Sequence, residues 1–158
     1  MLFGKSLAEY VRFAMPILVL VAVVGLARLA LSLAGVDDAV VKWLSITVAT
    51  WIGLIYFGIR VHTTGFGSYK QLLPLIVIET CLAEAIIIVG IVIAVFTGHA
   101  NIFSAPEYGG EANPWLHAGA HLVFGTIVGS LIGWLLGSLI LLVTKLVSKG
   151  PGATTESA

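Results

Sequence analysis

The sequence is poor in charged residues. It has 158 residues, of which 8 are lysine or arginine and 8 are aspartate or glutamate, so the charged fraction is only 10%. A soluble domain carries about 25% charged residues, and this chain therefore lacks the means to cover a water-facing surface. The hydrophobic fraction is 59% and the mean hydropathy is +1.08. Together these values predict an integral membrane protein.

The sequence also lacks cysteine pairs, net charge and catalytic motifs, the features on which several other classes of protein depend. A single cysteine, Cys81, excludes an intramolecular disulfide. The formal net charge of zero gives no basis for nucleic-acid binding. The sequence has no P-loop, no G-x-S-x-G, no H-E-x-x-H and no C-x-x-C motif. We therefore expect no enzymatic activity.

Four long apolar segments dominate the chain. Each reaches the length of about 20 residues that an α-helix needs to cross the hydrocarbon core. The predicted helices cover residues 7–34, 38–61, 69–97 and 114–148. We expect an all-α integral membrane protein, a single domain over residues 1–148 with four transmembrane helices in an antiparallel bundle. A loop covers residues 98–113, and the small, polar tail 149–158 is expected to be disordered.

The helix boundaries have their own signals. Ser6 and Glu9 in "SLAE" have the spacing of a capping box, as do Ser68 and Gln71 in "SYKQ". Pro16 is expected to bend the first helix. In a later segment, Asn113 is a suitable N-cap before a proline at the first helical position.

Basic residues predict the orientation. With the N-terminus in the cytoplasm, six basic residues lie inside and Lys42 alone lies outside, which is the positive-inside pattern. Both termini are then cytoplasmic, and the loop 98–113 lies outside. This arrangement is typical of a bacterial inner-membrane protein. The six inner residues are Lys5, Arg12, Arg60, Lys70, Lys145 and Lys149.

Glycine recurs at every fourth position of the last segment, in a pattern that resembles a glycine zipper. Glycine allows close backbone approach, on which helix packing in lipid depends. The stripe therefore marks a face that meets another helix, either of the same chain or of a second subunit. It consists of Gly125, Gly129, Gly133 and Gly137.

Three charged residues fall inside apolar segments. Such residues are costly in a membrane and are candidates for function by default. They are Arg28, Glu79 and Glu84. Depth in the membrane favours an ion pair of Arg28 with Glu84, whereas helical phase favours Glu79. The glutamate that does not pair with Arg28 is a candidate for carrying protons or cations.

Histidines gather near the outer side. His117 and His121 are four residues apart, the spacing at which two imidazoles on one helix can hold one metal ion. His99 and Glu111 are expected on the same side of the membrane. Zinc or copper suits such ligands, and haem held by two histidines is an alternative. The histidines can equally be interfacial residues that bond to the loop.

Three functional hypotheses follow. The sequence favours the first, a non-enzymatic bundle or accessory subunit in the lipid bilayer, which forms a homo-oligomer or joins other membrane subunits through the glycine face. The second is a small proton or cation transporter or channel that uses the intramembrane carboxylates. The third is a metal- or haem-binding membrane protein that uses the outer histidines.

Overall fold

The computed structural model describes residues 1–105 and 113–148, so Glu111 and the tail 149–158 lie outside the described residues. The described chain is built of helices and their connections. Four of its helical segments are long and apolar enough to cross a membrane, judged by length and composition. They are Leu7–Leu33, Asp38–Thr63, Tyr69–Thr97 and Pro114–Ser148.

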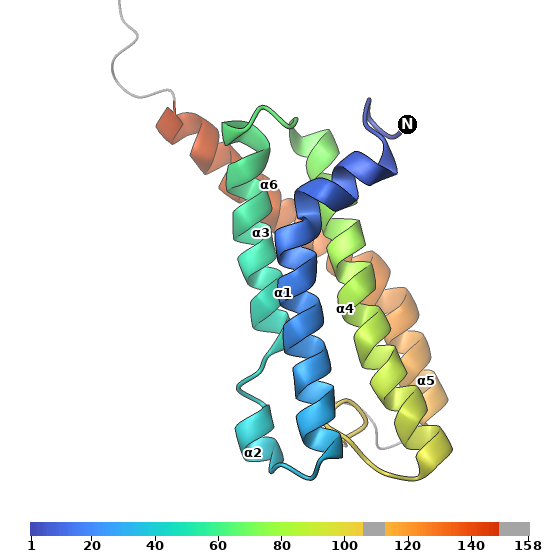
Figure 1. Ribbon diagram of the computed structural model, residues 1–158. Helices are drawn as coiled ribbons and strands as arrows, with labels where there is room; N and C mark the ends of the chain where they lie inside the picture. Colours follow the sequence, from blue (N-terminus) through green and yellow to red (C-terminus); the bar gives the residue numbers. More distant parts are fainter. Residues whose placement is uncertain (106–112, 149–158) are drawn as a thin grey trace, which may run out of the picture.

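The first segment is the single helix α1 (Leu7–Leu33), which begins at a capping box. The backbone N–H of Ser6 donates to Oε2 of Glu9 at 2.7 Å, and the backbone N–H of Glu9 donates to Oγ of Ser6 at 3.3 Å. Pro16 lies inside the helix. Because proline removes one helical hydrogen bond, it allows a bend. Figure 1 shows the first turns of α1 turning away from the rest of the helix.

The second segment is not one continuous helix over 38–61. It divides into a short helix α2 (Asp38–Val41) and the longer α3 (Ile46–Thr63). The side chain of Ser45 accepts a hydrogen bond from the backbone N–H of Val48 and starts α3. A serine at an N-cap competes with continued helix for the backbone donors, which accounts for the break.

The third segment is α4 (Tyr69–Thr97), which ends at Gly98 in the left-handed conformation, with φ 70°. The fourth changes its helical type along its length. It begins as α5 (Pro114–Ala120), widens into the π-helix η2 (His121–Val128), and continues as α6 (Gly129–Ser148).

The helices lie in layers. Helix α1 packs on α3 and α4, which pack on each other, and the last segment packs on α3 and α4 from the other side. Figure 1 shows α1 in front and the last segment crossing diagonally behind, from the lower end of α4 to the upper end of α3. The N-terminus and the end of α6 lie at the same, upper end of the molecule.

The glycine stripe meets a matching stripe on α4. Each of the four glycines of the stripe faces a residue of α4, and these residues are themselves spaced by four in the reverse direction. Gly125 faces Glu84, Gly129 faces Thr80, Gly133 faces Ile76, and Gly137 faces Ile76 and Leu72. The two stripes form an antiparallel contact within one chain, in which glycine allows the close approach that the sequence predicts.

The start of the loop between α4 and α5 folds back onto the helices. Asn101 is buried, and its side-chain amide donates to the carbonyl oxygen of Gly90 at 2.7 Å. The backbone N–H of Ile102 donates to Oγ of Ser32 at 2.8 Å. Phe103 is buried above Gly90. These contacts close the lower end of the helices between α1 and α4.

Two glycine substitutions test the close packing of the last segment. A methyl group at Gly58 would overlap Ile140 and approach the carbonyl oxygen of Gly137, whereas a methyl group at Gly129 would meet only Thr80, at an ordinary 3.7 Å. We expect Gly58→Ala to destabilise the protein by about 1–3 kcal/mol through overpacking. Gly129→Ala should leave stability unchanged or raise it. Unfolding by denaturant in mild detergent measures both, and equal losses would contradict this packing.

Candidate functional site

A cleft opens where α3 and the last segment diverge. Within the part of the chain that the structure describes, η2 packs on α4, α5 and α6 but not on α3. The divergence leaves a cleft of about 270 Å³, whose walls are mostly apolar side chains and the glycines Gly125, Gly129 and Gly133. Two carboxylates line it, Glu79 and Glu84, both from α4. The structure therefore brings both intramembrane glutamates to one hollow.

Glu79 lies at the centre of the helices. Its side chain is only 1% exposed, and it packs against Gly53 of α3 and near Ile17 of α1. Its Oε1 atom has no hydrogen-bond partner among the described residues. A buried carboxylate without a partner is costly unless a proton or a cation neutralises it. Glu79 is therefore either protonated or in need of a cation beside it.

Glu84 is the first member of a chain of hydrogen bonds. Its Oε2 lies 2.6 Å from Nδ1 of His121, and Nε2 of His121 lies 3.2 Å from Nε2 of His117. A carboxylate only accepts hydrogen bonds, so Nδ1 of His121 carries the proton between them. In the tautomer that has its only ring proton on Nδ1, His121 accepts at Nε2 a hydrogen bond from the Nε2–H of His117. The three side chains form a continuous relay from the cleft to the first turns of the last segment.

The π-helix lies next to this relay. It begins at His121, and the hydroxyl of Thr126 donates to the carbonyl oxygen of His121, five residues back, at 3.5 Å. Short π-helical stretches inside α-helices are frequent at functional sites. Here the wider helix presents both His121 and Gly125 to the same carboxylate of Glu84.

Glycines seat both carboxylates. A methyl group at Gly53 would overlap the carboxylate of Glu79, and one at Gly125 would overlap that of Glu84. From the sequence, the glycine stripe was expected to be a packing face and not to hold a carboxylate. The spacing of four that links Gly125 to His121 and His117 was the available signal for a shared face.

Glu84 has a different partner from the one that we expected. Depth in the membrane favoured Arg28, but the structure pairs Glu84 with His121 instead. Arg28 is buried and lies over the ring of Phe103, 5.3 Å from the ring centroid to Cζ. The expected pairing of Glu84 with Arg28 rested on how deep each charged residue lies in its helix. The contact of Arg28 with Phe103 was not foreseen, because the loop that carries Phe103 folds back through tertiary contacts.

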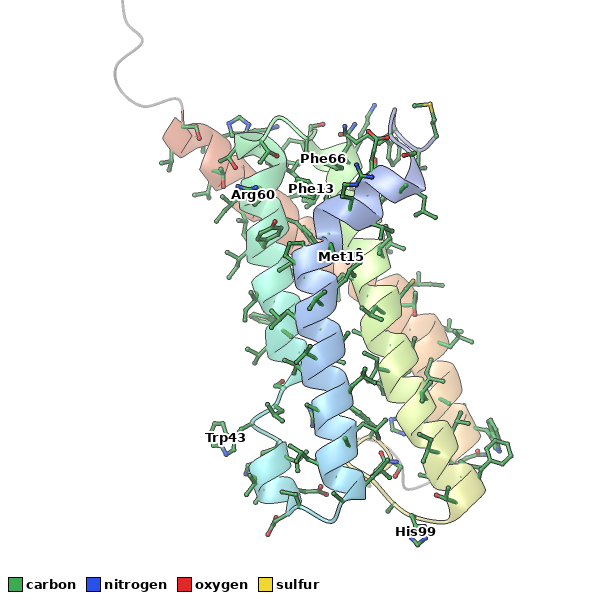
Figure 2. All side chains as sticks on the ribbon, viewed as in Figure 1. Phe13, Met15, Trp43, Arg60, Phe66 and His99 are labelled. Carbon is green, nitrogen blue, oxygen red and sulfur yellow. The ribbon has the colours of Figure 1, made fainter. Side chains whose placement is uncertain are left out.

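The histidines are not all brought together. His117 and His121 are adjacent, whereas His99 is exposed and points away from the helices at the lower end (Figure 2). Over residues 1–105 and 113–148, no three histidine, cysteine, aspartate or glutamate side chains gather as a metal site. The expected cluster with His99 is therefore not assembled there, and Glu111 lies outside the described residues.

Comparisons with known proteins give no further guide. The chain matches no family model, and neither the curated proteins nor the solved structures contain a significant match.

The proton position on His121 is directly testable. We expect ¹⁵N NMR of histidine-labelled protein to find a proton on Nδ1 of His121, because the carboxylate of Glu84 accepts a hydrogen bond there. In Glu84→Leu the acceptor is gone, and the ring should move toward the Nε2–H form. His62, on the far side of the molecule, provides the internal reference. An unchanged His121 signal in Glu84→Leu would contradict the relay.

Proposed function

We propose that this protein is a small transporter of protons or monovalent cations across a membrane. The observation that carries the proposal is the pair of carboxylates in one cleft, Glu79 and Glu84, with a chain of hydrogen bonds that leads from Glu84 through His121 to His117. Chains of glutamate and histidine inside membrane helices are typical of proton pathways. The relay provides a route from the lower end of the molecule to the carboxylates.

The residues between Glu79 and the upper end of the molecule favour a transporter over an open channel. Between Glu79 and the upper end lie the fully buried apolar side chains of Phe57, Leu72 and Leu75. A hydrated ion has no polar path through such a layer. In this conformation, therefore, an apolar layer separates the carboxylates from the upper end. Passage to the other side requires the helices to rearrange, as in alternating access.

We also propose how the chain is oriented in the membrane. The chain crosses the membrane four times with both termini in the cytoplasm, and the bacterial inner membrane is the location that the basic residues favour. Arg60 labels the upper end in Figure 2, and Trp43 and His99 label the lower end. The upper end would then face the cytoplasm, and the relay would face the outside.

The accessory-subunit hypothesis stays a prediction. The glycine face, on which that hypothesis placed a partner subunit, contacts α4 of the same chain. A homo-oligomer or a complex with other membrane subunits would therefore need another surface. The cleft holds two carboxylates among apolar helices, and ionisable residues in such a position are candidates for function. We favour transport for this reason.

Flux through liposomes tests the proposal. We expect the purified protein to acidify vesicles that hold a pH-sensitive dye when a potassium gradient and valinomycin drive proton entry. Glu79→Gln and Glu84→Gln each keep the shape of the side chain but remove its charge, and should reduce flux to that of empty vesicles. Cys81→Ser is the matched control, because Cys81 lies between them on α4 but is exposed. Wild-type flux equal to empty vesicles, or full flux in Glu84→Gln, would overturn the proposal.

Cysteine labelling tests the topology. In a Cys81→Ser background, we expect Ser148→Cys to be protected in intact spheroplasts from a reagent that does not cross the membrane. Val40→Cys in α2, a residue that is 60% exposed, should react. The reverse pattern would invert the proposed orientation.

A further inference from the structure

We infer that the cleft binds a monovalent organic cation with a single-ring or short alkyl body, and that this cation is a transported substrate. The inference rests on the proposed transport function and names its substrate class. It is drawn from the charge, the walls and the size of the cleft.

The charge of the cleft calls for a cation. Two carboxylates line it, and none of its lining residues, all of which the structure describes, is a lysine or an arginine. The carboxylate of Glu79 is 1% exposed, and its Oε1 atom, which packs against Gly53, has no hydrogen-bond partner among the described residues. Such a group is stable as a charge only beside a positive partner. A bound cation beside Glu79 supplies that partner.

The walls indicate an organic cation rather than a metal ion. Hard metal ions take six or more oxygen ligands, but most of this lining is apolar, from residues such as Leu54, Ile87 and Ile132. One of the few hydroxyls, that of Thr50, already donates to the carbonyl oxygen of Thr47 at 2.8 Å. Apolar walls with a small number of polar groups are typical of sites for small organic molecules.

The size of the cleft limits the body of the ligand. An apolar cavity of about 150 Å³ is enough for benzene, and this cleft measures about 270 Å³. There is room for one ring with an ammonium group. Trp51 lines the cleft and is 61% exposed, which places it at the rim. An indole face in that position can attract an ammonium group through its π-system.

Binding of benzyltrimethylammonium tests the inference, because this probe carries a permanent charge and one ring. We expect isothermal titration calorimetry of the full chain in mild detergent to detect saturable binding. The uncharged analogue neopentylbenzene, which has the same shape, should bind more weakly, and tetramethylammonium, which lacks the ring, should also bind more weakly. Equal binding of the uncharged analogue would mean that the cleft is merely an apolar groove for lipid or detergent, and would overturn the inference.

Substitutions place the binding in the cleft. Glu79→Gln should abolish binding of the probe, and Trp51→Leu should weaken it several-fold through loss of the cation–π contact. Trp43→Leu is the matched control, since Trp43 is exposed and does not line this cleft. Gly129→Leu fills the cleft from the opposite wall and should block binding, whereas Gly129→Ala should preserve it. Binding that survives both Glu79→Gln and Gly129→Leu would refute the site.

The two experiments separate the inference from the proposed function. Proton flux in liposomes without binding of the probe would retain transport and overturn the organic substrate. Binding of the probe without its movement across the vesicle membrane would retain the cation site but would show that the bound cation is not a transported substrate. Counterflow of radiolabelled probe in wild-type vesicles, lost in Glu79→Gln, is the result expected when both hold.

Discussion

The structure depends above all on the cost of placing carboxylates among apolar helices. A charge in such surroundings needs a partner or a proton, and the packing of α3, α4 and the last segment is arranged around the two glutamates of α4. Gly53 and Gly125 leave the space that each carboxylate occupies, and His121 provides the partner for Glu84. At these two points the space that glycine leaves holds a carboxylate, whereas elsewhere it lets the helices approach each other closely.

The matched stripes on α4 and the last segment have a second consequence. Because an α-helix turns 100° per residue, residues spaced by four drift gradually round its axis. Two such stripes in contact therefore make the helices cross at an angle, and the diagonal course of the last segment in Figure 1 agrees with this. The crossing brings α6 onto α3 at the upper end, where Gly58 meets Ile140, and leaves η2 away from α3 at the lower end. The cleft is the space that this divergence opens. Glu84 lines it as a member of the α4 stripe, whereas Glu79 lies outside that stripe and packs against Gly53 of α3.

The proposed transport mechanism links these features. In the proposal, protons move along the hydrogen-bonded chain of Glu84, His121 and His117, while Phe57 and its apolar neighbours close the upper side of Glu79. A site that is closed toward one end and lies between helices that touch at one end only is suited to opening and closing by a change in the crossing angle. The glycine contacts limit the cost of such a change, because they contain few side chains that must repack.

The sequence by itself determined the class of the fold. Scarce charge and four long apolar segments fix four helices that are long and apolar enough to cross a membrane, because hydrocarbon requires every backbone group to bond within its own helix. Spacing also placed Gly125, His121 and His117 on one face. Only the tertiary structure decided which groups meet: Glu84 with His121 rather than Arg28, Arg28 with Phe103, and Glu79 with Gly53. The break at Ser45, by contrast, is local, because the side chain of Ser45 caps the start of α3. Periodicity gives the face of a helix but not its rotation relative to a neighbour, and those pairings depend on that rotation.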